Sequence, residues 1–191
     1  MDQQKQIQKW LRETVKDDAE RIMDSQSSIY ADCAGSLKGK TSKQYKTLTK
    51  TILPRVALYK ALKNDSKLSP EAFDLTRKYM IEVVGKQKHK STSALEIIPG
   101  FYRIYSKSFL KIMRTTDLQK STQTEGKDYY DITITDCLWY NACKEFGCPE
   151  LCSAFCEVDD ITYGNLRKLG FTRTQTLGKG GDCCDFHFFK K

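Results

Sequence analysis

The chain has 191 residues, of which 39% are hydrophobic, and it carries a formal net charge of +8. This length suits one domain with a real apolar core, and the composition excludes a disordered chain. No apolar run approaches the roughly 18 residues of a membrane-spanning helix, and the N-terminal residues MDQQKQIQKW form no apolar signal segment. We therefore expect a cytoplasmic protein with no membrane partner, in which the thiols stay reduced.

The positive charge is concentrated in one part of the chain. Residues 1–120 hold 24 Lys and Arg against 13 Asp and Glu, whereas residues 121–191 hold 8 against 11. A basic half can bind nucleic acid, but no recognised nucleic-acid motif or stacking platform is present. We therefore interpret the basic half as a solvated helical surface and expect a small-molecule substrate and no nucleic acid as partner. The sequence does not indicate an oligomeric state.

The first part of the chain has helical patterns. Apolar residues at helical spacing predict a helix over about residues 4–24, which ends in the polar stretch 24–28 and is followed by a loop around Cys33. A second helical pattern covers Lys43–Lys63. Pro54 lies inside it, so either the helix kinks there or a new helix begins with Pro54 in its first turn.

Two more helices and a boundary follow. Ser-Pro-Glu at positions 69–71 supplies a capping hydroxyl, a proline and an acid at the positive end of the dipole, and predicts a helix that stops near Gly85. Residues 101–113 predict an amphipathic helix with its Tyr and Phe side chains in the core. The polar stretch Thr115–Lys127 is expected to be a linker.

After this linker the hydrophobic period changes. Apolar residues alternate with polar ones between Tyr130 and Ile134, which predicts a half-buried strand. Leu138–Phe146 is predicted to be a helix closed by Gly147, and Pro149 opens another.

The chain ends in a predicted hairpin. Phe171–Leu177 and Cys183–Phe189 read as strands joined by the glycine-rich turn 178–181. We therefore predict an α+β protein, in which an N-terminal helical region (1–115) packs on a C-terminal small antiparallel sheet with helices (128–191), as one compact unit.

Seven of the eight cysteines lie in the last third of the chain, together with several acids. Thiols and carboxylates at this density indicate that the chemistry is located here. Cys148, Cys152 and Cys156 are spaced by four, which places them on one helix face. Cys148 and Cys152 are expected to be buried as small hydrophobes. Cys156 directly precedes an acid cluster, so we expect it at a helix end, where the acids raise its pKa and share its proton.

Two further acids, Asp182 and Asp185, bracket Cys183 and Cys184. No Cys-x-x-Cys pair occurs, so a structural zinc site is not indicated. A mixed metal site remains an alternative, with ligands from Cys156, Asp159, Cys184 and Asp185. We otherwise expect no cofactor.

Arg173 precedes the predicted glycine turn and is the best candidate for binding a substrate carboxylate with two hydrogen bonds. The alternative is a salt bridge from Arg173 to Asp182 or Asp185.

The order of these residues forms a pattern of four elements. In chain order they are Cys137-x-Trp139, Cys156-x-x-Asp159, Arg173-x-x-Thr176 and Gly181-Asp182-x-Cys184-Asp185-Phe186. The pattern resembles the L-2-amino-thiazoline-4-carboxylic acid hydrolase family, and an upstream helix, Leu53-Pro54-x-x-Ala57-Leu58-Tyr59-x-x-Leu62, is similar to one common in that family. The C-terminal part resembles, more distantly, the 4-vinyl reductase domain.

The first resemblance implies a hydrolase that opens a C–N bond of a small cyclic amidine or amide. Such a reaction needs a thiolate or an activated water to attack the amidine carbon, an acid to protonate the ring nitrogen, and a cation for the substrate carboxylate. The catalytic residues it implies are Cys156, Asp159, Asp182 and Asp185. The substrate-binding residues it implies are Arg173, Cys137, Trp139, Thr176 and Cys184. The second resemblance implies a non-catalytic module that binds or senses a small molecule in an apolar cavity.

Overall fold

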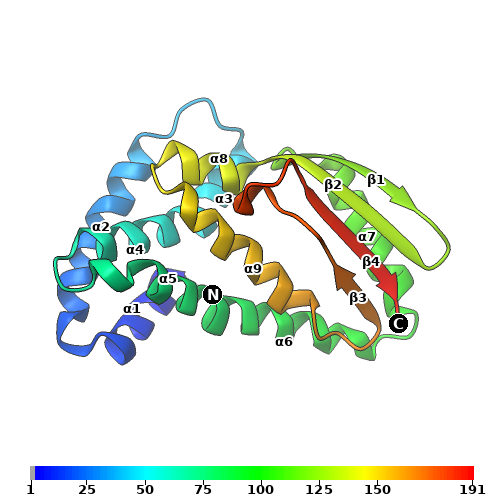
Figure 1. Cartoon of the computed structure of the whole chain (residues 1–191), viewed down its shortest axis with the longest axis horizontal. Helices are drawn as coiled ribbons and strands as arrows, with labels where there is room; N and C mark the ends of the chain where they lie inside the picture. The colour runs from blue at the N-terminus through cyan, green and yellow to red at the C-terminus, as the bar shows by residue number, and fades with distance from the viewer. Residues whose placement is uncertain (1–2) are drawn as a thin grey trace.

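A computed structural model describes residues 3–191 and shows helices packed against one side of a small sheet (Figure 1). Its four strands form a single antiparallel sheet in the order β1-β2-β4-β3. The predicted α+β class is therefore confirmed. Residues 1 and 2 of the expected helical region lie outside the described residues.

Seven α-helices precede the sheet in the described chain. They are α1 (Gln3–Thr14), α2 (Ala19–Gly35), α3 (Ser42–Thr47), α4 (Leu53–Asn64), α5 (Ala72–Tyr79), α6 (Lys86–Ala94) and α7 (Phe101–Thr115). The single helix predicted over 4–24 is wrong, because the chain breaks at Lys16, which has a positive φ of 44°. The loop expected at Cys33 is also wrong. Cys33 is buried and extends the apolar face of α2 against the core.

Two π-helical turns join neighbouring helices. Leu48–Ile52 links α3 to α4 and leaves Pro54 in the first turn of α4, which confirms that a new helix starts there. Met80–Gly85 links α5 to α6, so the helix predicted to stop near Gly85 continues. A Cβ at Gly85 would lie 3.0 Å from Cγ2 of Ile161, so this glycine allows close packing against another helix and does not end its own.

The sheet begins earlier than expected. Its strands are β1 (Gln119–Glu125), β2 (Tyr129–Cys137), β3 (Leu169–Thr172) and β4 (Cys184–Lys190). The linker prediction for Thr115–Lys127 is wrong, since β1 pairs with β2 in the register Gln123↔Ile132. β1 reads as polar because it is an edge strand with no buried residue.

The C-terminal hairpin is confirmed, but its first strand is shorter than predicted. β3 pairs with β4 through Phe171↔Phe188 and ends at Thr172. The carboxylate of Asp185 then accepts hydrogen bonds from the backbone N–H groups of Thr174 (3.0 Å) and Gln175 (2.8 Å). These bonds replace the strand ladder, so residues 173–183 form a loop.

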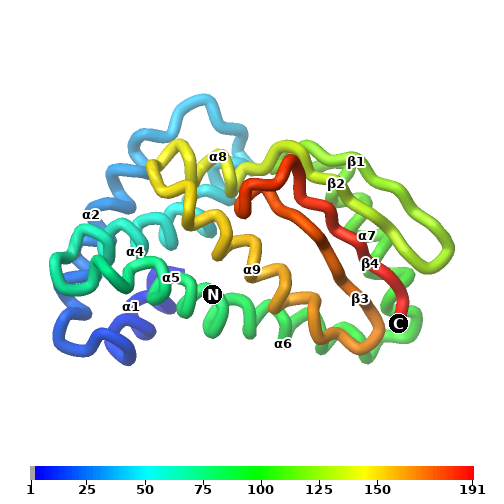
Figure 2. The backbone as a smooth tube through the Cα atoms, in the orientation of Figure 1, coloured from blue at the N-terminus to red at the C-terminus, as the bar shows by residue number. Residues whose placement is uncertain are grey.

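Helices α8 (Leu138–Glu145) and α9 (Cys152–Tyr163) lie between β2 and β3 in sequence. Gly147 closes α8 with a φ of 68°, as predicted. In Figure 2, α9 runs between the N-terminal helices and the sheet. Because α9 begins at Cys152 and ends at Tyr163, Cys156 lies inside this helix, and its expected position at a helix end is wrong.

Two buried clusters meet along α9. The first joins the N-terminal helices to apolar residues of α8 and α9, among them Cys143, Cys152 and Phe155. The second is aromatic and joins α7 to the sheet, where the Tyr130 and Phe188 rings stack with centroids 4.9 Å apart. α7 thus packs with the sheet, while α8 and α9 pack with the N-terminal helices.

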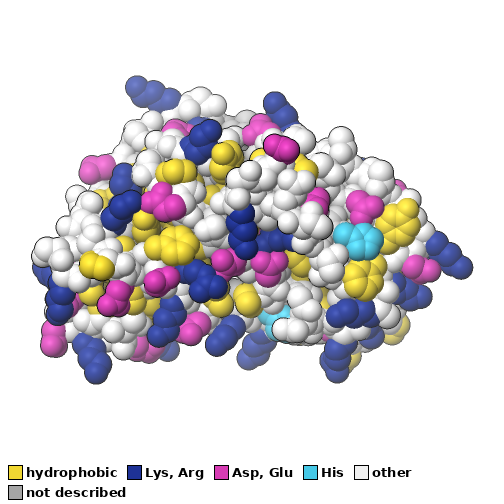
Figure 3. All heavy atoms as spheres, in the orientation of Figure 1, with side chains coloured by type: hydrophobic (Ala, Val, Ile, Leu, Met, Phe, Trp, Pro, Cys, Tyr) yellow, Lys and Arg dark blue, Asp and Glu magenta, His cyan; other side chains and the backbone are white. Residues whose placement is uncertain are grey.

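The molecular surface shows basic and acidic side chains interspersed over the face in Figure 3. Within residues 3–191, no helix combines the length and the apolar character that crossing a membrane requires.

Candidate active site

A pocket of about 240 Å³ opens where α4, α7 and α9 meet the sheet. Five residues named from the sequence line it: Cys137, Trp139, Cys156, Asp159 and Cys184. Most of the remaining wall is apolar and comes from α7, α9 and strands β2 and β4. A small apolar pocket with a few polar groups is the usual form of a small-molecule site.

The acids that follow Cys156 on α9 differ in whether they have partners. Glu157 accepts a hydrogen bond from Nε of Arg77 on α5 at 2.6 Å. Asp160 accepts one from Nη2 of Arg173 at 2.5 Å. Both carboxylates are thereby neutralised by cations from distant parts of the chain, so the acid cluster does not act on Cys156 as three free charges.

The Cys156 thiol lies among hydrogen-bond donors. The Cys152 and Cys184 thiols donate to its sulfur, the Thr176 hydroxyl is close by, and the Arg173 cation adds a favourable charge interaction. Together they hold the pKa of Cys156 well below its ordinary value, although burial opposes them. The expected rise in this pKa is therefore wrong, because the neighbouring acids are paired and the neighbouring thiols act as donors.

Asp159 lines the same pocket one helical turn from Cys156. Within the described chain its carboxylate has no hydrogen bond and no ion pair. Burial raises its pKa to about 6, against the opposing charges of Lys88 and Arg173. A thiol with a lowered pKa and a carboxyl with a raised pKa thus face one small cavity.

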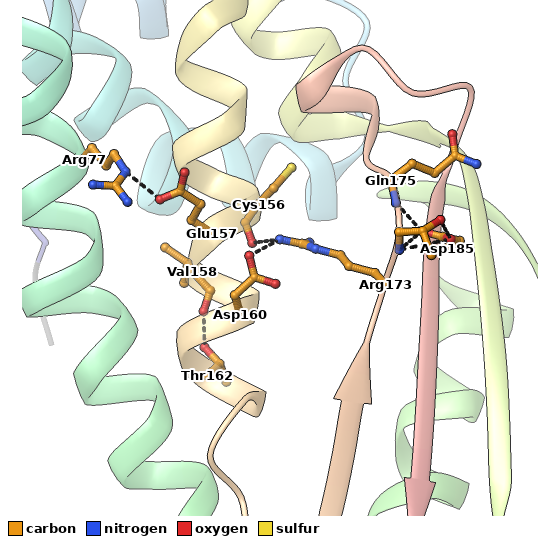
Figure 4. A network of polar contacts seen from close by, with 10 residues as sticks. Arg77, Cys156, Glu157, Val158, Asp160, Thr162, Arg173, Gln175 and Asp185 are labelled. Atoms are coloured by element: carbon orange, nitrogen blue, oxygen red, sulfur yellow. Dashed lines mark hydrogen bonds and ion pairs between the residues drawn. The ribbon is translucent and has the colours of Figure 1, made fainter.

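Arg173 reaches α9 from the loop after β3 (Figure 4) and lines a separate surface pocket, not the one that Cys156 lines. Its Nη2 donates to the Cys156 carbonyl at 2.8 Å as well as to Asp160. The alternative considered for Arg173, a salt bridge to Asp182 or Asp185, is not formed, since Asp160 is the partner. Arg173 therefore fixes the loop to α9 at Cys156.

The remaining predicted residues lie in the same loop. Thr176 is buried, and its hydroxyl oxygen has no hydrogen bond of standard geometry among the described residues. Asp185 also accepts from the Thr174 hydroxyl at 2.5 Å, so it organises the loop. Asp182 is exposed. Neither Asp182 nor Asp185 lines the pocket with Cys156.

The mixed metal site considered from the sequence needs four converging ligands. Cys156, Asp159 and Cys184 line the pocket, whereas Asp185 is engaged by the loop. Across residues 3–191, no group of three or more His, Cys, Asp and Glu side chains is arranged to hold a metal ion.

Three titratable residues of the pocket wall were not predicted from the sequence: Arg55 on α4, Lys88 on α6 and Tyr163 on α9. Arg55 had a sequence signal that was not used. It interrupts the apolar run from Ile52 to Leu58, where an arginine must be buried or must break the apolar face. Lys88 and Tyr163 gave no local signal.

Comparison with known proteins supports the family that the sequence pattern resembles. No curated protein and no solved structure matches the chain. A family model described as L-2-amino-thiazoline-4-carboxylic acid hydrolase matches residues 44–188, which include every residue of the pocket wall. The chain therefore belongs to the L-2-amino-thiazoline-4-carboxylic acid hydrolase family.

Proposed function

We propose that this protein hydrolyses a small cyclic amidine of the 2-amino-thiazoline carboxylate type, with Cys156 as nucleophile and Asp159 as proton donor. The observation that carries the proposal is the pairing of these two groups in one pocket. The thiol has a lowered pKa and the carboxyl a raised one. Two titratable groups whose pKa values move apart in this way are suited to opposite roles, one as nucleophile and one as acid.

The reaction consumes one water and needs no other co-reactant. The Cys156 thiolate adds to the amidine carbon, and the electron pair of the C=N bond moves to the ring nitrogen, which takes a proton from Asp159. The exocyclic amino group then supplies an electron pair, the ring C–N bond breaks, and one proton of the resulting iminium passes to the ring nitrogen, which leaves as a neutral amine. Water next adds to the same carbon and expels the Cys156 thiolate. One proton of this water returns to the exocyclic nitrogen and the other to Asp159, which leaves a ring-opened carbamoyl product and the starting protonation states of both residues.

The surroundings of Cys156 support this role. Donated hydrogen bonds from Cys152 and Cys184 stabilise the thiolate before it attacks and again when it leaves. Arg173 holds the Cys156 carbonyl and Asp160, which keeps the helical turn that carries both reactive groups in place. We therefore assign Arg173 as a positioning residue, and Cys137, Trp139 and Cys184 as walls of the substrate pocket.

The test is turnover of a panel of thiazolines, hydantoins and related cyclic amidines, with metal analysis of the same sample. Wild-type protein should release a free amine from at least one thiazoline carboxylate, and Cys156→Ser should abolish this release. Cys152→Ser is the matched control one turn away on the same helix, and it should keep a measurable rate because Cys152 donates to the nucleophile without attacking. A covalent adduct on Cys156, seen by mass spectrometry in single turnover, would support the nucleophile directly.

Normal turnover by Cys156→Ser would disprove the assigned nucleophile. Binding of these compounds without any turnover would instead favour the non-catalytic ligand-binding alternative, which the largely apolar wall of the pocket also suits.

A further inference from the structure

Arg55 is a buried cation without a counter-charge. It extends from α4 into the wall of the pocket and is only 2% exposed. Its Nε is buried without a hydrogen-bond partner, and none of the carboxylates in residues 3–191 forms an ion pair with it. A buried charge costs free energy unless it is paired, so this guanidinium lacks an anion that the folded chain does not provide.

The surroundings of Arg55 orient it without neutralising it. The Phe155 ring from α9 lies with its centroid 5.5 Å from the guanidinium carbon, and such a contact holds the planar group against an aromatic face. The nearby phenol of Tyr79 is also buried without a hydrogen-bond partner. Burial lowers the pKa of Arg55 to about 10, so the group remains a cation at neutral pH.

Two other arginines next to α9 have a structural role, because each pairs with a carboxylate of that helix. Arg77 is paired with Glu157, and Arg173 with Asp160. Both therefore have their charge compensated by the fold, and neither lines the pocket. Arg55 differs in both respects.

Lys88 adds a second positive charge to the pocket wall, and Asp159 is the single carboxylate among the residues that line it. Asp159 interacts with Lys88 but forms no ion pair with it within 4.0 Å among the described residues. In the state that the proposed reaction requires, with Cys156 as the thiolate and Asp159 protonated, the pocket carries one cation more than it has anions. A ligand with one negative charge would balance it.

We propose that Arg55 binds the carboxylate of the substrate and sets the preference of this pocket for small anionic heterocycles. The planar guanidinium, buried and held against Phe155, matches a carboxylate with two parallel hydrogen bonds. Arg55 and the two reactive groups come from different helices, so a substrate anchored by Arg55 would extend toward α9. This inference rests on the proposed function of the same pocket, and it replaces Arg173 as the residue that recognises the carboxylate.

The test compares two substrates that differ only in the carboxylate, 2-amino-2-thiazoline-4-carboxylate and 2-amino-2-thiazoline. Wild-type protein should prefer the carboxylate in kcat/KM. Arg55→Met should reduce that preference by about 10- to 100-fold, the range expected for hydrogen bonds to a charged group. The loss should appear mainly as a higher KM for the carboxylate, with turnover of the neutral compound little changed. Arg55→Lys should restore part of the preference, since it keeps the charge and loses the fork geometry.

Arg77→Met is the matched control, because it removes an arginine beside α9 that lies outside the pocket. It should leave the substrate preference unchanged. A folded Arg55→Met protein with the wild-type preference would overturn the proposal. Thermal unfolding provides a second readout. If Arg55 serves the ligand and not the fold, Arg55→Met should melt no lower than wild type, because an apolar side chain suits a buried site without a counter-charge.

Calorimetric binding of the same two compounds separates this inference from the proposed function. If neither compound is turned over, the hydrolase proposal fails. Arg55 is still supported if the carboxylate binds at least about 10-fold more tightly than the neutral compound and Arg55→Met removes that difference. Equal binding of the two compounds by wild-type protein would overturn the assignment of Arg55, whatever the outcome for turnover.

Discussion

Cys156 and Asp159 lie one turn apart on α9, yet their surroundings move their pKa values in opposite directions. Donated hydrogen bonds stabilise the thiolate, while burial without a partner stabilises the protonated carboxyl. The difference arises from single contacts. Glu157 and Asp160 each have an arginine within hydrogen-bond distance, and Asp159 has none among the described residues.

The first prediction concerns the pH dependence of turnover. Asp159 must be protonated to act as an acid, and its pKa is about 6, so kcat/KM should fall as the pH rises through about 6. Cys156 has a lowered pKa and should remain a thiolate over this range. The measurement is kcat/KM between pH 4.5 and 9. A profile that is flat between pH 5 and 8 would contradict the role of Asp159.

The second prediction concerns the stability cost of the same carboxylate. Its pKa is raised from 3.8 in the unfolded chain to about 6 in the folded one, so the folded state binds this proton more tightly. The resulting stabilisation is complete below pH 3.8 and is lost as the pH rises through about 6. Asp159→Asn should therefore be more stable than wild type at pH 7.5, by on the order of 2 kcal/mol after allowance for contact with solvent in the pocket.

Urea unfolding at pH 7.5 and pH 4 measures this difference. The difference in the free energy of unfolding between Asp159→Asn and wild type should disappear at pH 4. Asp17→Asn, at an exposed position on the far helical turn 16–18, is the control and should change stability by less than about 0.5 kcal/mol at either pH. An Asp159→Asn protein that is less stable than wild type at pH 7.5 would contradict the raised pKa.

The third prediction concerns alkylation by iodoacetamide, which reacts with the thiolate form. Cys156 and Cys137 line the same pocket, but burial raises the pKa of Cys137 to about 11. At pH 6.5, Cys156 should therefore be modified first, and Cys137 should react only as the pH rises. Peptide mass spectrometry after timed labelling distinguishes the two sites. Faster labelling of Cys137 at pH 6.5 would show that the thiolate does not reside at Cys156.

At the scale of the elements, the loop between β3 and β4 packs directly on the middle of α9. A Cβ at Gly178 would lie 2.9 Å from Sγ of Cys156 and 3.0 Å from the backbone of Cys152. Only a glycine allows this approach, because the obstacle includes helix backbone that cannot move aside. The loop therefore packs against Cys156 at Gly178, and Arg173 attaches it to the same helix.

The fourth prediction follows from this contact. Gly178→Ala should push the loop away from α9, cost about 1–3 kcal/mol of stability, and slow both turnover and Cys156 alkylation. Gly180→Ala in the same loop is the matched control. Gly180 has a φ of 84° and open space around a Cβ, so the alanine should cost about 1–2 kcal/mol in backbone strain without moving Cys156. Equal alkylation rates in the two variants would contradict the packing role of Gly178.

At the scale of the whole molecule, the two buried clusters share α9. Leu58 belongs to the cluster of the N-terminal helices and Phe188 to the aromatic cluster, and both are fully buried. Residues of α9 contact both clusters, with Phe155 and Val158 in the first and Tyr163 against the second. Neither cluster can therefore lose its packing without exposing part of this helix.

The fifth prediction is that the chain unfolds as one cooperative unit. Leu58→Ala should cost about 2–5 kcal/mol and Phe188→Ala about 3–5 kcal/mol, and each should lower the midpoint of one and the same transition. Circular dichroism and tryptophan fluorescence should give coincident urea curves for both variants. Two separate transitions, with only one shifted by each substitution, would show that the helical layer and the sheet fold independently.

The sequence by itself determined the features that depend on neighbours in the chain. Hydrophobic periods of 3.6 and 2 correctly identified α7, α8, β2 and the C-terminal hairpin, because side-chain direction repeats along a regular backbone. The i,i+4 spacing of Cys152 and Cys156 already placed these two thiols on one face of a helix, and both lie on α9. The pattern of Cys, Asp and Arg elements indicated the family that the match over residues 44–188 shows.

Only the tertiary structure decided which charges near Cys156 are compensated and which are not. Arg77 lies 80 positions from Glu157, and Arg55 lies farther still from α9, so no local pattern shows which of them has a partner. The same holds for the edge strand β1, which was predicted to be a linker. Its side chains are polar and show no strand pattern, and it is a strand because its backbone pairs with β2. A pKa depends on every charge and donor within several ångströms, and folding brings those groups together from distant parts of the chain.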